Sequence, residues 1–189
     1  CCDEEFQHRG VDKFLDWEHR DKVKAVIVGE PTELHLAVAC KGSIRFCIET
    51  TGTAAHTSMP EKGFNAIYLM AKIVQIIQEE IWVQCISKKD DRCGHASIAV
   101  SLIKGGEVVN AVPNHCVIHV DRRMIPGEHW EKVYDDIQSL ILGNLSEDER
   151  KHVEFGVPYL IDPSYGVQLP EELESGMQEV MKRHGLEQK

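Results

Sequence analysis

Hydrophobic and polar residues alternate in three segments of the chain, 43–49, 97–102 and 116–121. Successive side chains of a strand point to opposite faces, so this pattern predicts strands that have one face in a core and one face toward solvent. The pair Gly105-Gly106 separates the second segment from the third, which indicates two neighbouring antiparallel strands. Residues 152–157 form a fourth strand-like segment. The pattern therefore predicts an antiparallel sheet with a single core face.

Apolar residues at helical spacing predict two long helices between these strands, over 65–81 and 128–142. From residue 43 the order of elements is then β-α-β-β-α-β. This order is typical of the ferredoxin-like fold, in which two helices cover one face of a four-stranded antiparallel sheet. The fold class is therefore α+β. We also expect the sheet edge near 43–49, or the first helix, to be free to pair with a second copy.

The two ends of the chain have a different character. Residues 25–28 form a continuous apolar run of the length of a strand buried on both faces, as in parallel sheets, and residues 10–16 have short helical character. Residues 171–184 predict a terminal helix with one apolar side, whereas 87–94 and 163–170 predict loops. Both ends therefore indicate pieces of a separate α/β layer.

Composition narrows the possible partners and the location. With 189 residues and an apolar fraction of 42%, the chain can build a core of its own. Its formal net charge of -10 argues against a nucleic-acid partner, because phosphate recognition needs clustered lysine and arginine. No apolar run approaches the roughly 18–20 residues that cross a bilayer, so we expect no membrane partner. The seven cysteines form no Cys-x-x-Cys pair, which indicates reduced thiols and a cytoplasmic protein.

Two residues occupy positions that suit hydrolytic metal chemistry. Glu30 follows the apolar run at the carboxyl end of the predicted strand, where α/β sheets build their sites, and Pro31 restricts the turn after it. His56 lies in a glycine-led turn between a strand and the long helix. Each of these alone is more often a solvated surface residue. Asn110 and the pair Arg122-Arg123 could hold a carboxylate through amide and guanidinium donors, or could equally be surface polar residues.

Six short motifs follow one another along the chain. They are Asp3-Glu4-Glu5, Gly29-Glu30-Pro31-Thr32, Gly52 to Pro60 with Gly63-x-Asn65-Ala66, Gly105-Gly106, Asn110-Ala111-Val112-Pro113, and Asp121 to Glu128. In order and spacing they resemble the motifs of the di-zinc metallopeptidases, the family of aminoacylase, acetylornithine deacetylase, succinyl-diaminopimelate desuccinylase and the glutamate carboxypeptidases. The resemblance implies a hydrolase that cleaves the amide bond of N-acyl amino acids or small peptides.

The same resemblance implies a site with two zinc ions, or with cobalt or manganese in their place. Glu5 resembles the ligand of one ion and Glu30 the ligand of the other. Glu4 resembles the general base that takes a proton from the attacking water. A carboxylate beside two metal ions can carry that proton on to the leaving amine.

Three further residues resemble positions that complete the site of this family. His56 resembles the histidine that the dimerisation domain of the neighbouring subunit contributes, where it stabilises the developing oxyanion. Asn110 and Arg123 resemble positions that hold the carboxylate of the substrate. The resemblance therefore implies a homodimer, with an N-acyl amino acid or a small peptide as its substrate.

The family's remaining zinc ligands, an upstream His-x-Asp, a bridging Asp and a His near the C-terminus, have no counterpart in this sequence. We therefore expect an internal fragment of a longer enzyme, in which 42–158 is the dimerisation (lid) domain and 1–41 and 159–189 belong to the catalytic domain. Alone, the fragment should be inactive and should bind no zinc tightly. A non-catalytic dimerisation module or a ligand-binding module stays open as the alternative, because ferredoxin-like sheets host many functions.

Overall fold

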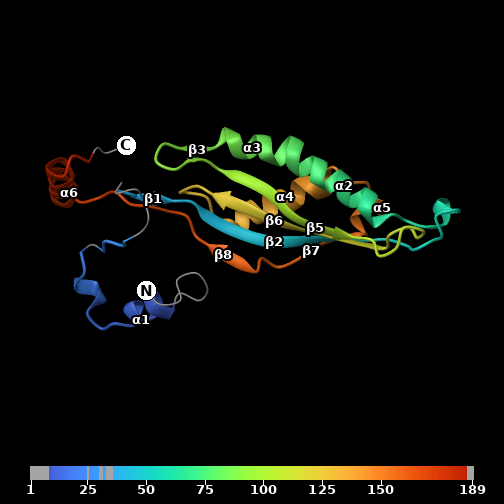
Figure 1. The fold of residues 1–189 in the computed structure, drawn as a ribbon, viewed down its shortest axis with the longest axis horizontal. Coiled ribbons are helices and arrows are strands. Elements are labelled where there is room, and N and C mark those ends of the chain that lie inside the picture. Colours follow the sequence, from blue (N-terminus) through green and yellow to red (C-terminus); the bar gives the residue numbers. More distant parts are fainter. Residues whose placement is uncertain (1–8, 25, 30–31, 33–35, 187–189) are drawn as a thin grey trace. The chain divides into compact units, whose positions relative to one another are not determined.

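A computed structural model describes the chain apart from residues 1–8, 25, 30–31, 33–35 and 187–189 (Figure 1). Contacts between residues divide the chain into two units. One comprises Cys1–Leu36 with Leu186–Lys189, and the other comprises Ala37–Gly185. Within the described residues, no helix has the length and apolar character needed to span a membrane.

The larger unit is built on one antiparallel sheet. The central strands β2 (Gly42–Thr51) and β6 (His115–Met124) pair over their full lengths, and β5 (Ser97–Gly105) pairs with the other side of β6. On the other side of β2 lie β7 (Val153–Phe155) and β8 (Leu160–Asp162), which pair with opposite halves of β2. These two short strands share one edge, so the fourth position of the sheet is a strand in two pieces.

The helices of this unit join the strands in the predicted order. After β2 come α2 (Ala66–Ile76), a π-helical turn η3 (Ile77–Ile81) and α3 (Trp82–Ser87), which run on from one another. After β6 come α4 (Trp130–Gly143) and the single turn α5 (Glu147–Arg150). The order β-α-β-β-α-β and the antiparallel sheet confirm the predicted ferredoxin-like α+β fold.

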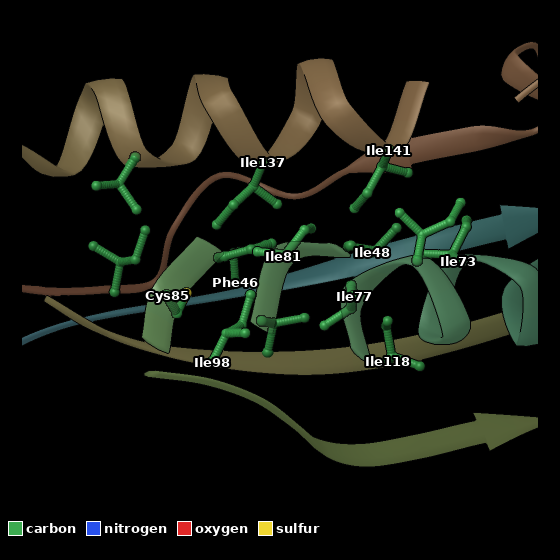
Figure 2. Packing of buried hydrophobic residues seen from close by; sticks show 14 of the residues in the cluster. Phe46, Ile48, Ile73, Ile77, Ile81, Cys85, Ile98, Ile118, Ile137 and Ile141 are labelled. Carbon is green, nitrogen blue, oxygen red and sulfur yellow. The ribbon is translucent and has the colours of Figure 1, made fainter. Parts of the chain in front are cut away.

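The core lies between the helices and one face of the sheet. Ile44, Phe46 and Ile48 alternate along β2 and are fully buried, as the alternating pattern predicted. Figure 2 shows Ile137 and Ile141 of α4 pointing into the same layer as the apolar side chains of α2, η3 and α3. The opposite face of the sheet carries the polar members of the alternation, and no helix of the core cluster covers it in the described part of the chain.

The first long helix extends further than its predicted end at residue 81. Ile81 and Cys85 are both buried, so the apolar stripe continues through α3 and the helix continues with it. The predicted loop 87–94 is also partly wrong, because β3 (Lys89–Asp90) and β4 (Gly94–His95) pair as a short hairpin. The carboxylate of Asp90 accepts the backbone N–H of Arg92 at 2.8 Å and so closes its turn.

Two short strands occupy segments without a predicted strand. In the predicted loop 163–170, β9 (Tyr165–Gly166) pairs with β1 (Ala39–Cys40). The terminal helix α6 (Glu171–Arg183) follows and agrees with the predicted one. Short pairs of this kind are set by a distant partner and leave no periodic signal of their own.

The prediction of a buried strand over 25–28 is wrong for the residues that are described. Val26, Ile27 and Val28 form no strand and are 61%, 71% and 69% exposed. A strand buried on both faces needs neighbouring strands, and the described residues of the smaller unit contain none. The short helix α1 (Arg9–Leu15) agrees with the predicted one.

The prediction of a free sheet edge near 43–49 is also wrong. These residues belong to β2, which pairs with β6 on one side and with β7 and β8 on the other. Among the described residues the sheet has two edges, one formed by β5, which pairs with β6, and the other by the two short strands β7 and β8. The alternating pattern identifies a strand but not its place in the sheet, which depends on how the helices cross over.

Replacing Gly52 with alanine should lower the free energy of unfolding by about 1–3 kcal/mol, a typical cost of overpacking. A Cβ at this position, directly after β2, would lie 2.1 Å from the carbonyl oxygen of Phe64 and 3.1 Å from that of Pro113. Urea denaturation of the chain measures the change. Gly143→Ala, in α4, is the matched control, because a Cβ there meets nothing within 4 Å. Equal stability losses for the two variants would contradict the predicted crowding at Gly52.

Candidate functional site

His56 lies in the loop that follows β2 and is held there by the connection between β5 and β6. The backbone of His56 forms a β-bridge with Ala111, and the N–H of Thr57 donates to the carbonyl oxygen of Asn110 at 3.1 Å. On the other side, the N–H of Val112 donates to the carbonyl oxygen of Ala55 at 2.7 Å. The structure therefore brings two predicted site residues, His56 and Asn110, onto adjoining loops.

The imidazole of His56 is exposed and oriented by its own turn. The backbone N–H of Ser58 donates to Nδ1 at 3.1 Å, and the Ser58 hydroxyl lies 2.8 Å from the same nitrogen. Because Nδ1 accepts a hydrogen bond, the neutral ring carries its proton on Nε2. The ring thus presents an N–H donor that can stabilise a negatively charged oxygen.

A cavity of about 940 Å³ lies beside these loops. Its wall is mainly apolar and comes from the loop after β2, the start of α2 and the connection between β5 and β6, including Phe64, Tyr68, Val108 and Pro113. Glu149 contributes a carboxylate to the wall, but that carboxylate is already paired with Lys72 Nζ at 2.8 Å. The ion pair and the backbone N–H of Ser146 lower the pKa of Glu149.

Arg123, the third predicted site residue within the described part, lies at the far end of the sheet from His56. Arg123 pairs with Ser43 near the start of β2, whereas Thr51 at the end of β2 leads into the His56 loop. At about 3.4 Å per residue, the eight steps along the strand from Ser43 to Thr51 span about 27 Å. Within one chain, His56 and Arg123 are therefore too far apart to contact one small substrate.

The guanidinium of Arg123 is held by a carboxylate on the same strand. Its Nε lies 2.8 Å from Oδ1 of Asp121, and its Nη2 donates to Oδ2 at 3.1 Å. Arg45 Nε donates to the same Oδ2 at 2.9 Å, and the Ser43 hydroxyl donates to Oδ1 at 3.3 Å. This polar cluster lies on the sheet face opposite the helices.

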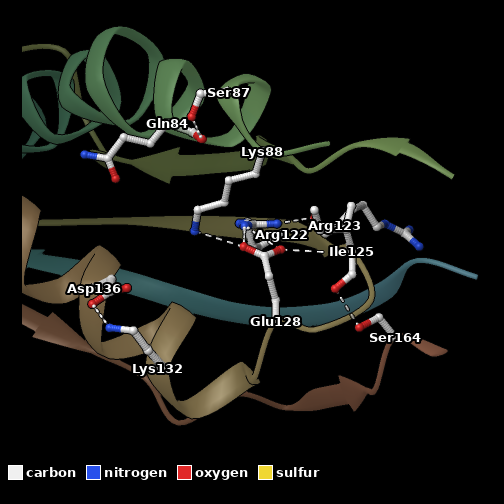
Figure 3. A network of polar contacts seen from close by, with 10 residues as sticks. All are labelled: Gln84, Ser87, Lys88, Arg122, Arg123, Ile125, Glu128, Lys132, Asp136 and Ser164. Atoms are coloured by element: carbon white, nitrogen blue, oxygen red, sulfur yellow. Dashed lines mark hydrogen bonds and ion pairs between the residues drawn. The ribbon is translucent and has the colours of Figure 1, made fainter. Parts of the chain in front are cut away.

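A second polar network lies on the core face (Figure 3). The sequence offered Arg122 as a carboxylate-binding or surface residue, and both interpretations are corrected by its burial against Glu128. The side chain of Arg122 is 2% exposed, and its Nη2 donates to both carboxylate oxygens of Glu128, at 2.7 and 3.0 Å. Glu128 also accepts Lys88 Nζ at 3.0 Å and the backbone N–H of Ile125 at 3.1 Å. Arg122 further donates to the carbonyl oxygen of Arg123, so the network holds the backbone of the candidate site. The signal was present in the alternation, which places residue 122 on the core face.

The predicted general base Glu4 and the predicted metal ligands Glu5 and Glu30 lie outside the described residues. Among the residues that are described, no three His, Cys, Asp or Glu side chains come together as a metal site. The geometry of the described residues therefore contains no donor set for a two-metal centre. Burial raises the pKa of the Cys85 thiol, which keeps it protonated beside the Arg122 network.

Comparison with known proteins assigns the sheet and its helices. Residues 38–149 match the family model of the peptidase dimerisation domain. An acetylornithine deacetylase from Buchnera aphidicola is 31% identical over 118 residues, which are 61% of this chain and 31% of that protein. An uncharacterized metallohydrolase from Methanocaldococcus jannaschii is 27% identical over 137 residues, 70% of this chain and 38% of that protein.

The fold is similar to that of solved peptidases. The crystal structure of the aminopeptidase PepT from Bacillus cereus superimposes with a TM-score of 0.59 and 18% identity, over 81% of this chain and 38% of that one. The chain thus spans less than two fifths of the length of these relatives. These matches confirm the family resemblance, and the chain belongs to the peptidase dimerisation domain family.

Proposed function

We propose that this chain is the dimerisation domain, with flanking parts of the catalytic domain, of a metal-dependent amidohydrolase. Residues 42–158 would form the dimerisation domain, and 1–41 and 159–189 the flanking parts. The substrate class is N-acyl amino acids or small peptides, and the location is the cytoplasm. The relatives named acetylornithine deacetylase and metallohydrolase support this proposal, as does the order of the six sequence motifs.

The proposed chemistry assigns the three acidic residues at the start of the chain different roles. Two zinc ions, or cobalt or manganese, would supply an activated water and polarise the amide carbonyl. Glu5 and Glu30 would each hold one ion, with further ligands from other parts of the enzyme. Glu4 would take the proton of the attacking water and deliver it to the leaving amine.

One observation carries the assignment of His56 to a neighbouring subunit. Arg123 lies near one end of the ladder between β2 and β6, and the His56 loop follows the other end, which is about 27 Å away along the strand. A substrate whose carboxylate is bound by Arg123 therefore cannot accept a hydrogen bond from Nε2–H of His56 in the same chain. In a twofold dimer, the His56 loop of one copy can reach the site of the other, so each site would be completed by its neighbour.

The β5 edge of the sheet offers the surface for such a dimer, because β5 is a long strand whereas the other edge consists of the short strands β7 and β8. Among the described residues no strand pairs with the outer side of β5, and this strand carries Leu102 and Ile103, which are 63% and 61% exposed. Helix α3 packs against β5 and exposes Trp82 and Val83 by 41% and 53%. An unpaired strand with adjacent apolar side chains is a template for a second strand. We infer an isologous dimer in which two copies of β5 meet.

The variant Ile103→Lys should weaken this dimer at least tenfold, because it buries an unpaired charge between two copies of β5. Sedimentation velocity over a range of protein concentrations measures the dissociation constant. Val157→Lys is the matched control, since Val157 is 85% exposed and lies between β7 and β8 at the other edge. If the dimer dissociates on Val157→Lys but survives Ile103→Lys, the interface lies at the edge formed by β7 and β8, and the proposed β5 interface is wrong.

The hydrolase itself is tested on the complete enzyme. N-Acetylornithine and other N-acyl amino acids are assayed before chelation, after chelation and after Zn²⁺ is restored. We expect activity to disappear with the metal and to return with it, while the 189-residue chain alone stays inactive. Tight binding of two zinc ions by this chain, or hydrolysis that survives complete chelation, would contradict the proposal.

A further inference from the structure

Two arginines share one carboxylate on the sheet face opposite the helices. Asp121 accepts Arg123 through Nε and Nη2, at 2.8 and 3.1 Å, and accepts Arg45 through Nε at 2.9 Å. Arg45 and Asp121 are direct partners in the register between β2 and β6, so the pairing follows from the strands themselves. The cluster of Arg45, Asp121 and Arg123 therefore contains two positive charges and one negative charge.

Part of each guanidinium group is still available to a ligand. Among the described residues, Arg45 bonds through Nε and Arg123 through Nε and Nη2, while neither Nη1 forms a hydrogen bond or ion pair. The two side chains are 39% and 43% exposed. Asp162 lies opposite Ser43 on β8 but forms no ion pair with either arginine in the described structure. The cluster is thus one negative charge short of neutral.

We propose that Arg45 is a second residue that binds the substrate carboxylate, beside Arg123. This inference rests on the proposed function, in which Arg123 holds that carboxylate. A planar guanidinium group matches the geometry of a carboxylate, and two adjacent guanidinium groups can bind one carboxylate from both sides. The bound carboxylate would also bring the charge of the cluster to zero. Asp121 keeps the two arginines together before the ligand arrives.

The backbone around this pair is held in place before any ligand binds. Arg45 lies on β2, which is hydrogen-bonded on both sides, and Arg123 lies on the neighbouring β6. The buried Arg122 donates to the carbonyl oxygen of Arg123. Ser43, two residues before Arg45 on the same face of β2, donates its hydroxyl to Asp121. Such a site loses little conformational freedom when it binds a ligand.

The test uses the 189-residue chain and two small probes, N-acetylglycine and its uncharged amide N-acetylglycinamide. NMR titration follows the Nε–Hε signals of the arginine side chains, which report on each guanidinium group separately. We expect N-acetylglycine to shift the signals of both Arg45 and Arg123 with one dissociation constant. The amide should shift neither, because it lacks the carboxylate.

Arg45→Gln should then weaken the binding of N-acetylglycine about tenfold or more, as expected for the loss of charge-assisted hydrogen bonds. Arg45→Lys keeps the charge but loses the planar fork and should give a smaller loss, which covers the case in which the glutamine variant does not fold. Arg150→Gln is the matched control and should bind like the unmodified chain. Arg150 is bonded to the Leu145 carbonyl oxygen, away from the cluster.

Each other result overturns the inference at a different point. If N-acetylglycine shifts Arg123 alone and Arg45→Gln binds normally, Arg45 only supports Asp121 and the inference fails while the proposed function stands. If the amide binds as well as the acid, the cluster is no carboxylate site. The proposed function fails separately, when the complete enzyme does not hydrolyse N-acyl amino acids although both arginine signals respond to the acid.

Discussion

Replacing Arg122 with alanine is expected to lower the free energy of unfolding by about 3–5 kcal/mol. The reason is that it removes one partner of a buried ion pair and leaves the other, Glu128, charged. The side chain of Glu128 is 10% exposed and would keep its charge with only Lys88 and a backbone N–H as partners. The variant also leaves a cavity beside Cys85 and Val133, which line the space next to Arg122. Urea denaturation followed by circular dichroism measures the loss.

Two variants show whether the loss comes from the unpaired charge. The double variant R122M/E128L replaces both partners with apolar side chains and should recover most of the lost stability. Lys132→Ala removes an exposed ion pair with Asp136, whose side chains are 77% and 55% exposed, and should cost less than about 0.5 kcal/mol. If R122M/E128L were as unstable as Arg122→Ala, the effect would come from lost packing rather than from the buried Glu128.

Replacing His56 with alanine in the complete dimeric enzyme is expected to lower kcat about 10²–10³-fold, the usual loss for one oxyanion-stabilising donor. The fold should be unaffected, because the ring is exposed and bonds only to Ser58 within the described structure. Steady-state kinetics with an N-acyl amino acid measures kcat and KM. Ser58→Ala serves as a comparison, since it removes the hydroxyl beside Nδ1 but keeps the ring and should have a smaller effect.

Mixed dimers decide which subunit supplies His56. His56→Ala and Glu4→Gln should each be inactive alone. If His56 acts on the neighbouring site, a mixed dimer has one site with both defects and one site with none. Random mixing in equal amounts makes half of the dimers mixed, so about a quarter of the original activity should return. If His56 acts within its own chain, both sites of the mixed dimer are defective and no activity returns.

Most of the fold could be predicted from local patterns. Alternation identified β2, β5 and β6, and helical spacing identified α2, α4 and α6, because each of these elements buries one side. The place of β5 at an edge could not be predicted, since any half-buried strand has the same pattern whether it lies in the middle or at the side. The pairs β1–β9 and β3–β4 are too short to show any period.

The candidate site was predictable in its residue types but not in its connections. His56 and Asn110 could be selected from their motifs, yet only the structure shows their loops in contact. Arg45 occupies an ordinary solvent-facing position in the alternation and becomes notable only when Asp121 is its partner across the strands. The acidic residues Glu4, Glu5 and Glu30 stay predictions from the sequence.

The full-length pairing of β2 with β6 has a consequence for how the enzyme would turn over. In the proposed dimer, one end of this ladder holds the substrate of its own subunit at Arg123, and the other end sends His56 to its neighbour. Ten consecutive register pairs leave the ladder no flexible point between these ends. Any rotation of one domain would therefore change both reaction centres at once. The turnover rates of the two centres would then be coupled, so the rate at one site would depend on whether the other site holds substrate.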